Sequence, residues 1–137
     1  MVRPALLAAA LLLAVTAAEA QTLLSPGEYE AMSEGRTLHY TYRGQPFGSE
    51  QYFADRRSLW RYDTGVCQAG RWHAEGKNAC FTYDDNPETM CWVFLRSGNR
   101  VVAMLVPRPG SPEADFVLDL SHIDDEPLDC PGPDVGM

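Results

Sequence analysis

The chain lacks the short motifs that usually mark an enzyme or a nucleic-acid-binding protein. It contains no Gly-x-Ser-x-Gly elbow, no Ser-x-x-Lys motif and no phosphate-binding P-loop. It also has no Cys-x-x-Cys pair, so a thiol redox role is not indicated. A formal net charge of −8 disfavours nucleic acid or an anionic membrane as a partner, because both bind basic faces. We therefore expect no catalytic residues and no cofactor.

Basic residues are missing from the C-terminal segment. Residues 111–137 carry eight acidic groups and no Lys or Arg, whereas residues 21–110 carry ten groups of each sign. Residues 124–137 are acidic and rich in proline, and such a segment cannot fold alone. We interpret it as a tail, with Asp124, Asp125 and Glu126 as a candidate surface for a basic envelope protein. The alternative is a solvated tail that only aids solubility.

A long apolar run occurs only at the start of the chain. Arg3 precedes the apolar residues 5–16, and Ala18 and Ala20 fit the small-x-small pattern of a cleavage site. The run of roughly 12–15 residues is shorter than the ~20 needed to span a bilayer. We predict a signal peptide over residues 1–20, a mature chain beginning at Gln21 without a membrane span, and a periplasmic or secreted location.

Strand patterns fill most of the remaining chain. Apolar and polar residues alternate from Arg36 to Tyr42, which predicts a half-buried strand. Similar patterns, separated by turn residues, cover residues 50–53, 58–62, 66–74, 79–83, 90–96, 100–106 and 116–120. A Ser-x-x-Glu capping box at Ser25 and a glycine at Gly35 predict one short helix over residues 26–34.

These patterns predict one mainly β domain over residues 21–123. The expected architecture is a small antiparallel barrel or sandwich of about seven to eight strands, with one short N-terminal helix. The spacing of the patterns leaves the choice between a closed barrel and an open sandwich undecided.

The four cysteines all lie after residue 20. An even number in an exported chain predicts two structural disulfides. If the loop after residue 83 is a two-residue turn centred on residues 85–86, antiparallel pairing places Cys80 opposite Cys91. Cys67 and Cys130 would then join, and this bond would tether the tail to the domain. Four cysteines allow three connectivities, so the other two stay open.

Residues that ligate metals are few and scattered. Three histidines lack the spacing of a zinc motif: His39, His73 and His122. We interpret them as surface residues, and the alternative is that they converge in space. Asp84, Asn86 and Glu88 alternate as in the first part of a calcium loop, but Thr89 and Leu95 replace the Gly and Glu that an EF-hand needs. We therefore predict a solvated hairpin loop and no metal site.

Aromatic residues are abundant on the predicted strands and include Trp60, Trp72 and Trp92. They could line a ligand cavity inside a barrel. In a domain of this size such rings more often form the core itself, because filling a narrow barrel takes large side chains. A solid core would favour a protein-binding role, and an apolar cavity would favour a small ligand.

Three stretches carry a resemblance. Residues 65–72 have the pattern Gly-x-Cys-x-x-Gly-x-Trp, residues 79–83 read Ala-Cys-Phe-Thr-Tyr, and Cys91-Trp92 follows; residues 34–38 read Glu-Gly-Arg-Thr-Leu. Together they resemble small exported bacterial, periplasmic proteins of unknown function with a Cys/Trp-rich β meander. The resemblance spans residues 25–105 and implies a fold and a location, not a reaction. The chain is also similar in size and predicted form to periplasmic inhibitors of C-type lysozyme, whose inhibitory loop motif it does not match.

We therefore expect an exported, non-catalytic binding or accessory domain of the periplasm. One alternative is a small-ligand carrier with an aromatic-lined cavity. Another is an envelope hydrolase or a hydrolase inhibitor.

Overall fold

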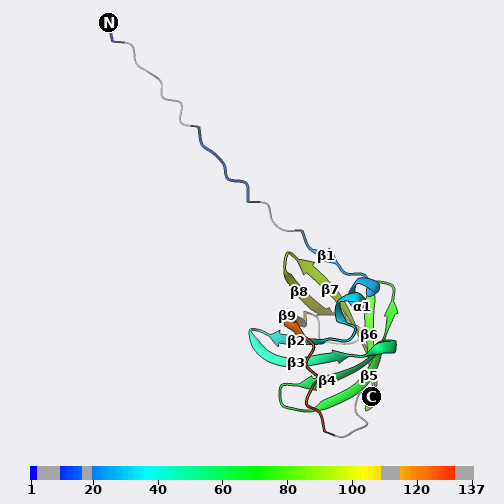
Figure 1. Ribbon diagram of the computed structural model, residues 1–137. Helices are drawn as coiled ribbons and strands as arrows, with labels where there is room; N and C mark the ends of the chain where they lie inside the picture. Colours follow the sequence, from blue (N-terminus) through cyan, green and yellow to red (C-terminus); the bar gives the residue numbers. More distant parts are fainter. Residues whose placement is uncertain (3–9, 17–19, 109–114, 132–137) are drawn as a thin grey trace.

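The structure of the protein, a computed structural model, describes residues 1–2, 10–16, 20–108 and 115–131. Eight antiparallel strands close into one barrel in the order β7-β6-β5-β4-β3-β2-β9-β8, and β8 pairs back to β7 (Figure 1). A ninth strand, β1, pairs with residues 95–96 of β7. The elements are β1 (Thr22–Leu23), α1 (Pro26–Ser33), β2 (Thr37–Tyr42), β3 (Gln45–Tyr52), the 3-10 helix η1 (Ala54–Arg56), β4 (Arg57–Tyr62), β5 (Cys67–Glu75), β6 (Asn78–Tyr83), β7 (Asn86–Ser97), β8 (Arg100–Leu105) and β9 (Val117–Asp124).

This architecture confirms the predicted mainly β fold with one short N-terminal helix, and it decides for a closed barrel. Strand β1 was not predicted, and β7 begins at Asn86, four residues before the predicted start. Two other strands also differ from the prediction at one end. The strand expected from residue 50 begins at Gln45, because Arg43 and Gly44 both have positive φ and form a tight turn that returns the chain to the sheet at once. The last strand continues to Asp124, past the predicted domain boundary at residue 123.

Both predicted disulfides are present. Cys67 bonds to Cys130 and Cys80 to Cys91. The predicted turn between β6 and β7 was wrong by one residue, because Tyr83 pairs with Asn86. A register shift between residues 82 and 83 then restores the expected pairing of Cys80 with Cys91.

Helix α1 covers one end of the barrel (Figure 1). Its N-terminus has the predicted capping box, in which Ser25 and Glu28 each accept a hydrogen bond from the other's backbone. Tyr29 on this helix is 1% exposed, stacks on Phe94 at 3.9 Å between ring centroids and meets the edge of Trp72. The helix therefore plugs this end with an aromatic side chain.

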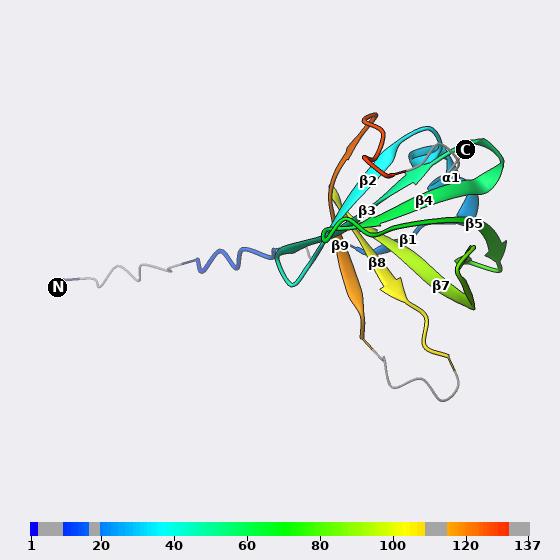
Figure 2. The same cartoon turned by 90° about the horizontal axis from the view of Figure 1, so that it is seen from below.

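Residues 125–130, called the strap below, follow β9 and cross the outside of the barrel. The strap returns past β2 toward β4 and β5 (Figure 2). The Thr37 hydroxyl on β2 donates to the Glu126 carbonyl at 2.7 Å. The other contacts are Leu128 N–H to Gln51 Oε1 on β3 at 2.9 Å, Arg61 Nε on β4 to the Asp129 carbonyl at 3.0 Å, and the disulfide from Cys130 to Cys67 on β5. The acidic segment is thus attached to four neighbouring strands as far as residue 130.

Part of the predicted signal peptide is described. Residues 10–16 form neither helix nor strand and lead away from the barrel (Figure 1). Residues 3–9 and 17–19, with Arg3 and the predicted cleavage pattern, lie outside the described residues, as do residues 132–137 of the tail. Within the described ranges, none of the helices has the length and apolar character required to cross a membrane.

Candidate functional site

The barrel encloses a cavity of about 260 Å³. It reaches the end of the barrel at which β4, β6 and β8 finish, and its walls are mainly aromatic. The aromatic lining includes the rings of Tyr40, Phe47, Trp60, Tyr62, Tyr83 and Trp92. Of the lining residues, Phe81 and Phe94 are 3% and 4% exposed, whereas Tyr62 and Phe116 are only half-buried. The cavity is therefore more accessible from the end opposite α1.

One charged side chain, Glu50 on β3, lines this cavity. It lies opposite Trp60 in the β3–β4 ladder and is 3% exposed. The Tyr83 hydroxyl donates to both of its carboxyl oxygens at 3.1 Å. Among the described residues that line the cavity, the other polar groups are tyrosine hydroxyls, the indole N–H groups of Trp60 and Trp92, and the amides of Gln68 and Asn86. None of these described lining residues is Lys, Arg or His. Glu50 thus has no positive partner within the cavity wall.

Burial raises the pKa of Glu50 to about 8, and the neighbouring hydroxyl groups of Ser58 and Tyr83 only partly oppose this rise. Tyr83 supplies the well-formed bond; the Ser58 hydroxyl is close, but its geometry falls short of a hydrogen bond. The other titratable groups facing Glu50 are tyrosines whose own pKa values are raised, chiefly by burial: Tyr29, Tyr40 and Tyr52. At neutral pH Glu50 is therefore largely protonated.

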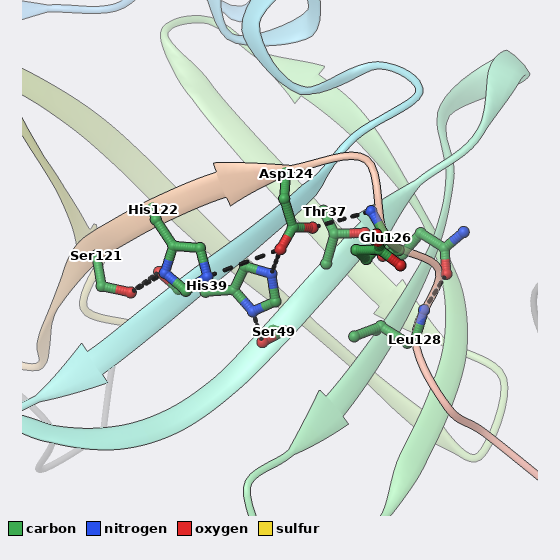
Figure 3. A network of polar contacts seen from close by, with 9 residues as sticks. Thr37, His39, Ser49, Ser121, His122, Asp124, Glu126 and Leu128 are labelled. Atoms are coloured by element: carbon green, nitrogen blue, oxygen red, sulfur yellow. Dashed lines mark hydrogen bonds and ion pairs between the residues drawn. The ribbon is translucent and has the colours of Figure 1, made fainter.

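A second group of polar side chains lies on the outer face of β2 and β9 (Figure 3). His39 and His122 are partners across these strands, and their rings stack at 4.1 Å between centroids with planes 9° apart. The Asp124 carboxylate follows two residues after His122. Its Oδ2 lies 2.9 Å from His39 Nε2 and 3.7 Å from His122 Nε2. The fold therefore brings together two of the three histidines that were predicted to be scattered surface residues.

Each of these three side chains also has a hydrogen-bond partner for its remaining polar atom. His39 Nδ1 lies 2.7 Å from Ser49 Oγ on β3, and His122 Nδ1 lies 3.0 Å from Ser121 Oγ. The remaining Asp124 oxygen, Oδ1, accepts the Glu126 backbone N–H at 3.0 Å. Partial burial raises the pKa of Asp124, but that N–H and the His39 ring outweigh it, so the pKa lies below its usual value.

This arrangement separates Asp124 from Asp125 and Glu126, the other two residues of the predicted surface for a basic protein. Asp124 is half-buried and bonded to His39, whereas Asp125 and Glu126 are exposed at the start of the strap. A role for these carboxylates in binding a basic protein stays a prediction, now carried mainly by Asp125 and Glu126. The third histidine, His73, pairs with Glu75 at 3.0 Å on β5.

The predicted hairpin loop with its alternating oxygen groups is a short turn. Asn86 already belongs to β7 and accepts the Glu88 backbone N–H, and the Glu88 side chain pairs with Arg108. Asp84 donates its backbone N–H to the Ala69 carbonyl. These residues behave as hairpin residues.

Two features of the site were missed by sequence reasoning. No functional role was predicted for Glu50, although the alternation of Gly48, Glu50 and Tyr52 places it on the inward face once β3 is known to begin at Gln45. The pairing of His39 with His122 had no local signal, because β2 and β9 are far apart in the sequence.

The chain was compared with known proteins. No family model, no curated protein and no solved structure matches it. The resemblance to small exported bacterial proteins stays a prediction, and the functional interpretation rests on the geometry of the chain's own residues.

Proposed function

We propose that the protein is an exported binding protein that holds a compact organic amine inside its barrel. The observation that carries this proposal is the buried Glu50 carboxyl in an aromatic-lined cavity whose wall contains no basic side chain. The proposal develops the small-ligand alternative of the sequence analysis, because the barrel contains a cavity where a protein-binding domain would have a solid core.

Charge argues for an amine. An ionised carboxylate in a dry cavity needs a nearby positive charge, and the wall of this cavity supplies none. The faces of Trp60, Tyr40 and Phe47 carry the negative side of the aromatic quadrupole, which attracts cations. A protonated amine would satisfy Glu50 and the rings together. Its binding would release the Glu50 proton, so affinity should rise between about pH 6 and about pH 8.

The size of the cavity limits the ligand. An apolar cavity of about 150 Å³ holds benzene. At about 260 Å³, this cavity has room for one ring with a short side chain, and it is too small for a long lipid chain. An amine with a single aromatic or alicyclic body fits these limits.

The two disulfides support the proposed export, because such bonds are typical of proteins from oxidising compartments. The predicted signal peptide points the same way. Mass spectrometry of the protein recovered from expressing cells tests this part: we expect a chain that begins at Gln21, and a chain that keeps residues 1–20 would contradict it.

Ligand binding is tested with a matched pair of probes, 2-phenylethylamine and 2-phenylethanol. Quenching of Trp60 and Trp92 fluorescence reports occupation of the cavity, because both rings line it. We expect the amine to bind at least about tenfold more tightly than the alcohol, and Glu50→Gln to abolish this preference because it removes the charge and keeps the shape.

The possible outcomes separate the two parts of the proposal. If amine and alcohol bind the parent protein equally, the cavity binds ligands but the amine assignment is wrong. If neither binds, and other compact amines also fail, the binding function itself is wrong. Leu105→Trp, which fills the cavity, should block both probes. Val66→Trp is the matched control, because Val66 is 57% exposed and lies outside the cavity wall.

A further inference from the structure

We propose that His39, His122 and Asp124 form a Zn²⁺-binding site on the outer face of the barrel, independent of the cavity. The three side chains come from β2 and β9 and point toward one another (Figure 3). One possible ligand atom from each of the three side chains lies within 4.8 Å of the other two. Two imidazoles and one carboxylate are a common ligand set for zinc with an open coordination position.

The distances suit such an ion. Zinc–ligand bonds of about 2.0–2.2 Å place neighbouring ligand atoms of a tetrahedral site about 3.2–3.6 Å apart. The distances from Asp124 Oδ2 to the two Nε2 atoms, 2.9 and 3.7 Å, lie on either side of this range. The His122 ring lies nearly parallel to the His39 ring, so it must rotate about its side-chain bonds to point Nε2 at the same ion. Its side chain is 61% exposed and free to make this rotation while the strands keep their positions.

Each histidine also has a serine hydroxyl within hydrogen-bond distance of its Nδ1 atom. Metal-bound histidines usually donate their other ring N–H to a fixed acceptor, which sets the tautomer. Ser49 and Ser121 hydroxyls occupy these positions here, at 2.7 and 3.0 Å from the Nδ1 atoms of His39 and His122. Each ring can thus donate from Nδ1 and direct the lone pair of Nε2 toward the ion.

A simple ion pair does not account for the arrangement. Contact between His39 and Asp124 alone would not require His122 to stack on the first ring with its Nε2 directed to the same oxygen.

The second histidine cluster serves as an internal comparison. His73, Glu75 and Cys80 also place possible ligand atoms close together. Cys80, however, is bonded to Cys91 and has no thiolate to offer. His73 and Glu75 alone supply two ligands, which is one fewer than a zinc site needs from the protein.

The ligand chemistry selects the kind of ion. Imidazole nitrogen suits zinc and its neighbours in the transition series, whereas Mg²⁺ and Ca²⁺ prefer sites made of oxygen. The open side of the site faces solvent, since the His122 side chain is 61% exposed and that of Asp124 33%. Water or a ligand from solution would complete the coordination.

Isothermal titration of the full chain without a polyhistidine tag tests the proposal. We expect one Zn²⁺ per chain and no measurable heat of specific binding with Mg²⁺. His122→Ala should weaken Zn²⁺ binding by at least about tenfold, because an exposed ligand is lost while the fold is kept. His73→Ala, the matched control, should leave the affinity unchanged.

A second variant tests the hydrogen bond between His39 and Ser49. Ser49→Ala should weaken binding by about 10–100-fold, because it frees the His39 ring without removing a ligand. Zn²⁺ should also raise the melting temperature of the parent protein and not that of His122→Ala, since an ion that binds only the folded state stabilises it. Equal affinities of His122→Ala and the parent, or equal losses in His122→Ala and His73→Ala, would overturn the proposed site.

Discussion

The buried Glu50 predicts that the stability of the barrel decreases as the pH rises through neutrality. Burial raises its pKa from 4.5 to about 8 in the folded protein. The folded state therefore keeps a proton that the unfolded state releases between these two values. Stability falls with pH wherever the unfolded state binds fewer protons than the folded state.

The size of the effect follows from the two pKa values. Each unit of difference corresponds to about 1.4 kcal/mol, so the full change between 4.5 and about 8 is about 5 kcal/mol. From about pH 5.5 to about pH 7.5 the expected loss is about 3 kcal/mol. Above about pH 8 the loss should level off, because Glu50 is then ionised in both states.

Glu50→Gln is the matched variant, because the amide has the shape of the protonated acid and does not titrate. Urea unfolding of both proteins, followed by tryptophan fluorescence at several pH values, gives two free energies of unfolding whose difference isolates Glu50. All other titrating groups contribute to both proteins and largely cancel. We expect the stability of the parent to fall relative to the variant across this range. A difference independent of pH would refute the reasoning, since it would mean that Glu50 ionises as readily in the barrel as in water.

Two further predictions concern the covalent and close-packed parts of the fold. Replacing Cys67 and Cys130 by serine should cost about 4 kcal/mol in urea unfolding, as expected for a bond that joins residues 63 apart in the sequence, and a loss below about 1 kcal/mol would contradict this. Gly70→Ala should cost about 1–3 kcal/mol, because its Cβ would lie 2.5 Å from the Thr82 carbonyl oxygen. Gly27→Ala, the control in α1, meets no close atom and should stabilise the protein by about 0.5–1 kcal/mol, and equal effects at the two glycines would contradict the close contact.

Local patterns in the sequence predicted most of the barrel. The alternation from Arg36 to Tyr42 and the capping box at Ser25 depend on neighbouring residues only, and both elements lie where they were expected. The disulfide between Cys80 and Cys91 was predicted from a hairpin and is present, although the assumed turn was displaced. Short-range geometry is therefore readable from this sequence.

Closure of the barrel and assembly of the two sites depend on long-range pairing, which the sequence does not encode locally. Pairing of β2 with β9 both closes the sheet and places His39 beside His122. The inward position of Glu50 follows from the early start of β3, which a tight turn with two positive φ angles decides. A glycine such as Gly44 indicates a turn, but not how soon the next strand begins.

The strap gives the barrel a property that hydrogen bonding alone would not provide. From Cys67 the chain runs through β5, β6, β7, β8 and β9, and the strap then passes outside β2, β3 and β4 back to the same cysteine. Together with the disulfide, this path is a continuous covalent loop around the circumference of the barrel. Strands β2, β3 and β4 lie inside the loop. This closed path opposes separation of β9 from β2, the strands whose pairing has no short connecting turn. Reduction of this one bond should make that separation easier and so open the wall of the barrel at this seam.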